Sequence, residues 1–519
     1  MILVNDVRLP LDTNFEKLSS SVSFRGVKIK SAKLFRKSVD ARRKNDVFFC
    51  CSLLIETDND SAAVKKIKNA KIYEEPVYNY KKCENEPSRR PVIVGFGPAG
   101  IFAAYTLAHA GLCPIVLERG RDVDSRTADV KNFWESGKLN PESNVQFGEG
   151  GAGAFSDGKL TTGIKDLRLR EVLKVFVKHG APENILYDAK PHIGTDVLSL
   201  VIKNIRNEII KLGGEVRFGH RLERINAENG RLVSIEVGGD TDYILPCEKL
   251  ILAIGHSARD TFYMLKNTGF QMIKKPFAVG MRIEHPQSMI NRALYGEFAD
   301  HPALSAADYK LAVHLENGRG VYTFCMCPGG YVVNASSENG MTAVNGMSYM
   351  ARDGKNANSA VLTEVLPEDL PDDILSGIEL QRKIEKAAYD ITGGKAVPVS
   401  TVCEYLKGKK SEPVCEPTVK PRAEFCDIEK IFPDFINASL KEGISELGRK
   451  LPGFDSDGTL LTAPESRSSS PVRIVRDESM NSVSVFGVYP SGEGAGYAGG
   501  IMSAAVDGMK SAESLIDSL

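Results

Sequence analysis

One segment, residues 92–119, constrains the fold of this chain more than any other. Two short apolar runs, Val92–Val94 and Ile115–Leu117, flank a stretch of small residues that opens with three glycines at G-x-G-x-x-G spacing. These glycines are Gly95, Gly97 and Gly100, and the second apolar run ends at Glu118 and Arg119. This pattern is typical of the β-α-β unit that binds dinucleotides, which consists of a strand, a glycine turn, a helix and a second strand that ends in an acidic residue.

Each residue type in this unit has a physical task. Gly95 permits the tight turn, Gly97 lets the backbone approach a pyrophosphate, and Gly100 lets the helix pack against its strand. Unpaired N–H groups at the helix start, around Pro98 and Ala99, and the positive end of the helix dipole favour phosphate. Glu118 is placed to accept hydrogen bonds from ribose hydroxyls.

Residues 91–117 carry no formal charge, so a membrane span is the competing interpretation. The glycines and prolines sit where the nucleotide unit needs turns, and they would interrupt a spanning helix. The first residues, MILVNDVR, also lack the basic and apolar regions of a signal peptide. We therefore expect a cytoplasmic protein without a membrane segment.

Composition narrows the class of protein further. The 519 residues allow two to four domains, and the net charge of −1 provides no overall basic field for nucleic acid. The ten cysteines have no disulfide-scaffold or zinc spacing, and we predict no metal site. No nucleic-acid or membrane partner is expected, and the oligomeric state is not predicted.

The chain divides into four segments. Residues 1–88 form a small N-terminal α+β domain, with strands at 22–30 and 47–56 around a basic run at 33–44, and a ferredoxin-like fold is expected. The basic run could bind a nucleic acid or an acidic partner, or be a solvated surface. A polar linker, 81–90, leads to the first part of the dinucleotide-binding domain. The predicted domains are 1–88, 89–275 (first part of the dinucleotide-binding domain), 276–450 (inserted substrate or cap domain) and 451–519 (its C-terminal part).

Three motifs resemble those of two-domain FAD-binding oxidoreductases: GFGPAG with the following Glu118-Arg119, ILAIGHSARDT at 251–261, and SGEGAGYAGGI at 491–501. Longer strings, including SVDARRK, GGAGAFSDGKLTT, KPFAVGMRIEHP, FCMCPGGYVVNASSENG and ESRSSSPVRI, are similar to bacterial FAD-dependent dehydrogenases described as NAD(FAD)-utilising. The resemblance implies an α/β, Rossmann-like FAD-binding domain with a central parallel sheet and a small β meander.

The resemblance also implies which residues hold FAD. The first unit would bind the ADP half, and the strand ending at Gly255 would close the site. Gly492-Glu493 stands where the family has Gly-Asp, beside the pyrophosphate and ribityl chain, and the helix after Gly496 would add a positive dipole end. The predicted FAD-binding residues are Gly95, Gly97, Pro98, Ala99, Gly100, Glu118, Arg119, Gly151, Ser156, Lys159, Gly255, Gly492, Glu493 and Gly496. NAD(P)H, as electron donor, would have to visit the flavin without a Rossmann unit of its own.

Four residues are candidates for the chemistry. Lys159, in the glycine-rich loop 147–163, could stabilise negative charge on a reduced flavin, or be a surface lysine. Arg282 and His285 could bind a substrate carboxylate and move a proton. Alternatively, they have structural roles: a salt bridge with the nearby Glu284, and a histidine ring that hydrogen-bonds to the backbone.

Cys327 is the fourth candidate. Together with Cys325 it would share one face of a strand, against the flavin or in the core. Two further polar sets could contact an anionic substrate or merely support turns. They are Arg352 with Asn356 and Asn358, and Arg467 with Arg473.

These observations predict an FAD-dependent oxidoreductase that transfers hydride between a small organic substrate and flavin N5. Two alternatives stay open at this point. The flavin could have a structural or sensing role while the N-terminal domain binds a partner, or the chain could modify RNA through the basic SVDARRK region.

Overall fold

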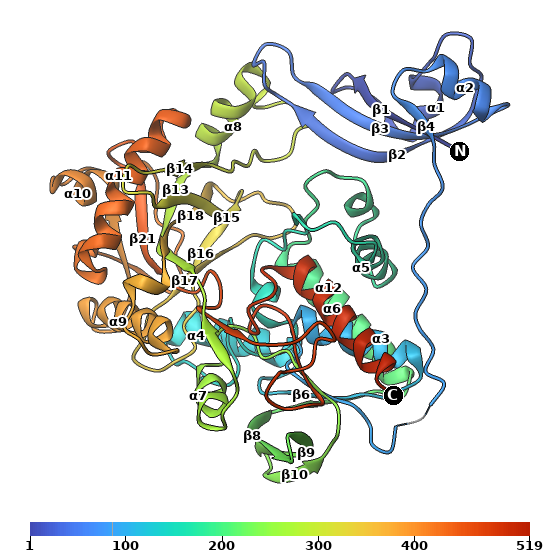
Figure 1. Cartoon of the computed structure of the whole chain (residues 1–519). Coiled ribbons are helices and arrows are strands. Elements are labelled where there is room, and N and C mark those ends of the chain that lie inside the picture. Colours follow the sequence, from blue (N-terminus) through green and yellow to red (C-terminus); the bar gives the residue numbers. More distant parts are fainter. Residues whose placement is uncertain (86) are drawn as a thin grey trace.

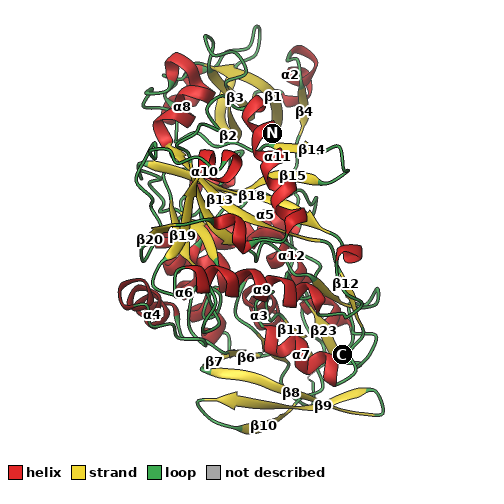
Figure 2. Cartoon of the chain, turned by 90° about the vertical axis from the view of Figure 1, so that its left-hand side faces the viewer, coloured by secondary structure: helices red, strands yellow, loops and turns green. Residues whose placement is uncertain are grey.

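The computed structural model describes residues 1–85 and 87–519, so residue 86 of the predicted linker lies outside the described residues. From top to bottom, Figure 2 shows the N-terminal domain, a large mixed sheet, the predicted dinucleotide-binding domain and a small three-stranded meander. Within the described ranges, no helix is both long and apolar enough to span a bilayer.

The predicted dinucleotide-binding domain is built on a five-stranded parallel sheet of order β23-β11-β5-β6-β7. Its central strands are short and fully buried, as expected for a sheet covered on both faces. The strands are β5 (Val92–Val94), β6 (Ile115–Glu118), β7 (Glu215–Phe218), β11 (Leu250–Leu252) and β23 (Val488–Pro490). Strands β8 (His220–Glu228), β9 (Arg231–Gly239) and β10 (Tyr243–Pro246) form the predicted meander.

The C-terminal strand does not neighbour the first nucleotide unit directly. Strand β23 pairs with β11, and β11 separates it from β5. The following helix, α12 (Ile501–Asp517), nevertheless packs directly against α3 (Pro98–Ala110). The two ends of the nucleotide domain therefore meet through their helices.

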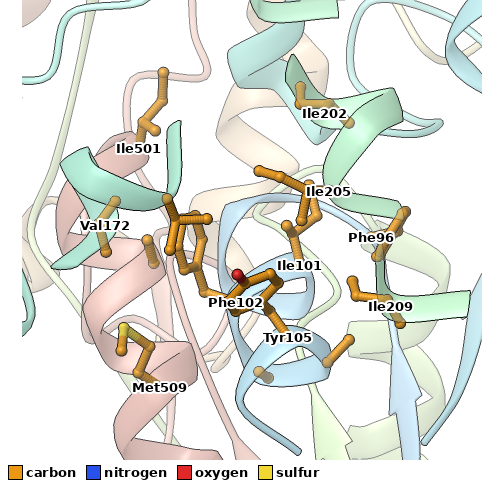
Figure 3. Packing of buried hydrophobic residues seen from close by; sticks show 14 of the residues in the cluster. Phe96, Ile101, Phe102, Tyr105, Val172, Ile202, Ile205, Ile209, Ile501 and Met509 are labelled. Atoms are coloured by element: carbon orange, nitrogen blue, oxygen red, sulfur yellow. The ribbon is translucent and has the colours of Figure 1, made fainter. Parts of the chain in front are cut away.

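Four helices form one layer of this domain: α3, α5 (Arg168–Lys178), α6 (Thr195–Lys211) and α12. Figure 3 shows Phe102 and Tyr105 of α3 between Val172 of α5, Ile205 and Ile209 of α6, and Met509 of α12. Each of these apolar side chains is at most 2% exposed, and their packing fixes where the helices begin. An additional helix, α4 (Val123–Ser136), follows β6 and was not predicted.

The inserted domain contains a seven-stranded sheet of order β14-β15-β18-β13-β21-β19-β20. Its strands are β13 (Phe277–Pro286), β14 (Ala312–His314), β15 (Gly320–Cys327), β18 (Asn356–Val365), β19 (Val397–Thr401), β20 (Ala423–Phe425) and β21 (Leu460–Glu465). Helices α8 (Gln287–Tyr295), α9 (Ser376–Ile391), α10 (Val402–Lys407) and α11 (Asp434–Lys450) accompany it. Because β21 pairs with β13, the domain extends past residue 450, where we had placed its end.

Shorter elements connect these sheets. They are α7 (Arg259–Asn267), the paired strands β12 (Met272–Lys274) and β22 (Val472–Ile474), and the hairpin β16 (Tyr331–Asn334) with β17 (Val344–Met347). Strand β12 lies just before the inserted domain and β22 just after it, so their pairing closes the insertion at its base.

The N-terminal domain has an antiparallel sheet of order β4-β1-β3-β2, with connections β-α-β-β-α-β. This is the ferredoxin-like arrangement. Its elements are β1 (Ile2–Leu9), α1 (Leu18–Ser21), β2 (Ile29–Asp40), β3 (Phe48–Thr57), α2 (Asp60–Lys66) and β4 (Ala70–Ile72). The basic run lies largely on edge strand β2, rather than between strands, which agrees with the use of lysines to protect an exposed sheet edge.

An extended segment leads from this domain down one side of the molecule (Figure 1). It is held in place by side chains: Tyr78 donates to Glu513 of α12 (2.6 Å), and Tyr80 donates to Glu171 of α5 (3.0 Å). The segment just before the predicted linker is therefore a strap, around Tyr78 and Tyr80, fixed to the helix layer. The domain also contacts the body elsewhere, since Lys37 N–H donates to Tyr187 O at 2.7 Å.

Candidate functional site

A cavity of about 720 Å³ lies between the dinucleotide-binding domain and the inserted domain. Its volume falls in the range typical of cofactor and ligand sites, roughly 300–1,000 Å³. Residues from both ends of the chain line it. Of the predicted FAD-binding residues, the lining includes Gly95, Gly97, Pro98, Ala99, Glu118, Arg119, Gly151, Ser156, Lys159, Gly255 and Glu493.

Two helices begin at this cavity. Helix α3 has Gly97 at its N-cap, α12 has Gly500, and both glycines line the wall. Glycine has no side chain with which to cap the helix, so the first N–H groups of both helices keep their hydrogen-bonding capacity for a ligand. Two converging helix starts suit an anion such as a pyrophosphate.

The glycines of the first unit are required by close backbone contacts. A Cβ on Gly100 would lie 1.9 Å from Gly95 O, and one on Gly95 would lie 2.3 Å from Ala253 O. Gly95 also has φ of +95°, which disfavours other residues. Gly100 itself lies behind the cavity wall and sets the distance between α3 and its strand.

Backbone N–H groups occupy most of the hydrogen-bond acceptor positions of the Glu118 carboxylate. Its carboxylate accepts from Phe96 N (2.8 Å), Gly120 N (2.9 Å) and Gly148 N (2.9 Å). A carboxylate offers about four acceptor positions, so one position on Oε2 is left for a ribose hydroxyl. The neighbouring Arg119 pairs with Glu142 (2.8 Å) and Asp260 (2.9 Å) and lies over the Phe147 ring at the cavity wall.

The glycine-rich loop is held by an arginine that sequence reasoning missed. Arg126 of α4 is 0% exposed and donates to the carbonyls of Asn144 (2.8 Å), Val145 (2.9 Å), Gly148 (3.3 Å) and Glu149 (2.7 Å). Burial lowers the pKa of Arg126 to about 10, which still leaves it charged near neutrality. Its only sequence signal is an arginine on the apolar side of an unpredicted helix.

Two further predicted residues act behind the wall. Gly492 donates its N–H to Asp507 of α12 (2.7 Å), and Asp507 is paired with Arg476 (2.7 Å). Gly496 accepts from Arg473 Nε (3.2 Å), which places Arg473 behind the cavity, whereas Arg467 lines it. Asp507 was also missed, because nothing in its local sequence marks it.

Glu493 occupies the cavity wall at the start of α12. The Gly500 N–H donates to its Oε2 at 3.4 Å, and its Oε1 lies 3.9 Å from His256 Nε2. Burial raises the pKa of Glu493 to about 7, whereas burial and the charges of Arg467 and Arg259 lower the pKa of His256 to about 3. At neutral pH the histidine is therefore uncharged, and Glu493 is poised between its two forms.

Lys159 extends from the glycine-rich loop to the inserted domain, where its Nζ donates to Met326 O. The same loop is anchored by Asp157, which accepts from Arg352 Nε at 3.0 Å. Arg352 lines the cavity, but Asn356 and Asn358 are buried behind it. Lys159 and Arg352 thus connect the two domains across the cavity.

The candidates Arg282 and His285 lie behind the wall, and both are 0% exposed. Arg282 pairs with Glu465 (2.9 Å) instead of the expected Glu284. His285 points into the apolar core, where its Nε2 lies 2.8 Å from Phe454 O, and burial lowers its pKa to about 4. This placement corrects the expectation of a proton-transfer role for His285 and matches the alternative of a backbone-satisfied histidine.

The cysteine pair does not alternate as predicted. A register shift between Phe324 and Cys327 and a φ of +41° at Cys325 break the strand pattern. Cys325 consequently lines the cavity, while Cys327 is buried behind it against Arg282 Nη2 (3.5 Å). The hydrogen bond from Cys327, with the charges of Arg282 and Lys159, lowers the pKa of Cys325.

The donor set fits a dinucleotide. Two helix starts, a glycine loop and one free acceptor position on Glu118 suit phosphates and ribose, while Lys159 and, from the inserted domain, Arg467 and Cys325 line the same cavity. Such a division suits a cofactor whose reactive ring extends toward the inserted domain.

Comparison with known proteins identifies the class. Residues 276–468 match the family described as "FAD-dependent protein, C-terminal domain-like". The whole chain is 47% identical, over 99% of its length and 98% of the relative, to a Clostridium beijerinckii protein described as uncharacterized. The chain therefore belongs to the same family as that protein, and its residues 276–468 are similar to the C-terminal domain of FAD-dependent proteins.

Solved structures resemble the chain more remotely. A triple mutant of the flavin-dependent brominase Bmp2 shares 12% identity, with 83% of this chain and 80% of that chain covered and a TM-score of 0.38. A geranylgeranyl bacteriochlorophyll reductase-like protein from Thermoplasma acidophilum shares 11% identity, with coverage of 82% and 77% and a TM-score of 0.36. The family match supports FAD, and none of these comparisons supports NAD(P)H.

Proposed function

We propose that this protein is an FAD-dependent oxidoreductase that transfers a hydride between a small organic substrate and bound FAD. The observation that carries the proposal is a single cavity that joins two uncapped helix starts to a charged wall of the inserted domain. Bound FAD would supply a ring that accepts or gives up a hydride at N5.

The residues of this chain divide the remaining tasks. The starts of α3 and α12 would hold the pyrophosphate, and Glu118 would orient the ADP ribose through its free acceptor position. Lys159 and Arg467 would place positive charge near the substrate and the reduced ring. The inserted domain would cover the reacting atoms and exclude water.

The test begins with the purified full-length protein. We expect a yellow protein, or one that takes up FAD when it is added, whose flavin absorbance is bleached under argon by members of a metabolite panel. A colourless protein that takes up no FAD would exclude the proposed function.

A further inference from the structure

The cavity wall of the inserted domain contains a carboxyl group that the sequence analysis did not single out. Glu465, the last residue of β21, is 2% exposed and lines the cavity. Its Oε2 accepts from Arg282 Nη1 at 2.9 Å. Its Oε1 has no hydrogen-bond partner among the described residues and is not sealed off by protein, so it is the oxygen that borders the cavity.

We propose that Glu465 is the catalytic proton acceptor of this site and that Arg282 is its positioning residue. The proposal rests on the proposed oxidoreductase function and defines its substrate class. The substrate would carry a hydroxyl or amino group on the carbon that is oxidised, because that group has a proton to give up when the carbon loses its hydride.

The oxidation then balances. The carbon–hydrogen bond breaks and its hydride carries two electrons to the flavin, while the oxygen- or nitrogen-bound proton passes to Glu465 Oε1. A carbon–oxygen or carbon–nitrogen double bond forms in the substrate. In the reverse direction the protonated carboxyl group returns the proton, so one side chain serves both directions.

The hydrogen bonds of Arg282 hold this carboxyl group in place and do not leave Arg282 to bind a substrate. Its guanidinium also donates to Asn358 Oδ1 (3.0 Å) and Cys325 O (2.6 Å), so four donated contacts fix its orientation. The chain makes room for it at Gly346, where a Cβ would lie 2.0 Å from Arg282 Nη2. Such a restrained partner leaves Glu465 with one orientation and one open oxygen.

The surroundings of Glu465 set its pKa, so that the carboxyl group can take up and release a proton. Burial raises its pKa to about 7, the Arg282 charge opposes this rise, and the thiolate form of Cys325 reinforces it. Cys327 and Tyr309 also lie near Arg282, while Arg467, two residues along the chain, is paired with Glu385 (2.7 Å). A group with a pKa near 7 is suited to exchange protons at neutral pH.

The first arm of the test needs neither flavin nor substrate. Dicyclohexylcarbodiimide, an apolar reagent, adds to protonated carboxyl groups that it can reach and leaves an adduct that peptide mass spectrometry locates. We expect labelling at Glu465 near neutral pH that fades as the pH rises through about 7. Cys325→Ser should keep the label, and Glu465→Gln should lose it.

The second arm follows flavin reduction under argon by a panel of alcohols, hydroxy acids and amines. Glu465→Gln should slow the reduction by about 100-fold or more while flavin binding persists. The matched control is Glu284→Gln, since Glu284 is also a buried carboxyl group of this sheet but accepts from Asn356 Nδ2 (3.3 Å) behind the wall. Its reduction rate should stay within about twofold of the wild type.

The outcomes separate the two proposals. Unlabelled Glu465, or a Glu465→Gln variant that is reduced as fast as the wild type, would overturn the role of Glu465 and leave the oxidoreductase function standing. A wild-type protein that binds no flavin, or whose flavin no compound reduces, would overturn the oxidoreductase function even if Glu465 is labelled. Arg282→Lys should shift the pH dependence of Glu465 labelling, because Arg282 donates to this carboxylate at 2.9 Å, and an unchanged pH dependence would contradict the positioning role of Arg282.

Discussion

The two ends of the cavity are built in different ways. The end formed by α3, α12 and the glycine-rich loop consists mainly of backbone N–H groups and glycines. The end formed by the inserted domain consists of side chains from separate strands, among them Glu465, Cys325 and Arg467. Backbone sites recognise features that all dinucleotides share, whereas side chains select a particular substrate.

The two ends also differ in how far apart in the sequence their key residues lie. Gly95, Gly97 and Gly100 lie within six residues, and their spacing alone indicates what they do. Arg282 and Glu465 are 183 residues apart and meet only because β13 pairs with β21. The first kind of site is therefore visible in a sequence, and the second becomes visible only in a fold.

The largest effect is expected at the backbone end, from Gly100→Ala. The new Cβ would lie 1.9 Å from Gly95 O and would push α3 away from β5. We expect FAD affinity to fall by about 100-fold or more, because overpacking of this kind costs about 1–3 kcal/mol or more. Flavin fluorescence titration measures the change. An affinity equal to that of the wild-type protein would show that backbone spacing does not control this end.

The second effect concerns the arginine that holds the glycine-rich loop. Arg126→Met removes donors to four buried carbonyls, and we expect a loss of about 3 kcal/mol in the free energy of unfolding. Urea unfolding followed by circular dichroism measures it. Arg121→Met provides the control, since Arg121 is exposed and pairs with Asp129 at 3.2 Å. Similar stability of both variants would contradict the assigned role.

A third prediction uses the raised pKa of Glu493, which is about 7 in the folded protein because the group is buried. The folded state holds this proton more tightly than the unfolded state, so its stabilising contribution is present below the ordinary glutamate pKa and is lost as pH rises toward 7. The charged form would also repel phosphates. We expect FAD affinity to decline as pH rises through about 7, and Glu493→Gln to flatten that decline in a titration series.

The smallest effect is expected far from both ends of the cavity, in the extended segment around Tyr78 that follows the N-terminal domain. Tyr78→Phe removes the hydrogen bond to Glu513 (2.6 Å). We expect the free energy of unfolding, measured by thermal denaturation, to fall by about 1 kcal/mol, and the FAD affinity to stay unchanged. A larger loss of FAD affinity would show that the strap positions α12. Deletion of residues 1–88 would remove this contact together with the domain, so the point variant is the cleaner experiment.

Several expectations depended on local patterns and succeeded where the pattern was strong. The short apolar runs at 92–94 and 115–117 became buried parallel strands because each is bounded by turns or polar residues. The alternation of Cys325 and Cys327 failed, since a bulge in β15 turns one residue toward the cavity and leaves the other behind. A bulge depends on the partner strand, so strand periodicity could not reveal it.

The sequence by itself determined the dinucleotide-binding unit, because glycine spacing, buried strands and a helix start act within about thirty residues of one another. Only the tertiary structure decided which side chains of the inserted domain face the cavity. It placed His285 in the core, joined Arg282 to Glu465 and directed Cys325 into the cavity. The physical reason is that these contacts depend on strand pairing over long separations, for which a single sequence carries no local signal.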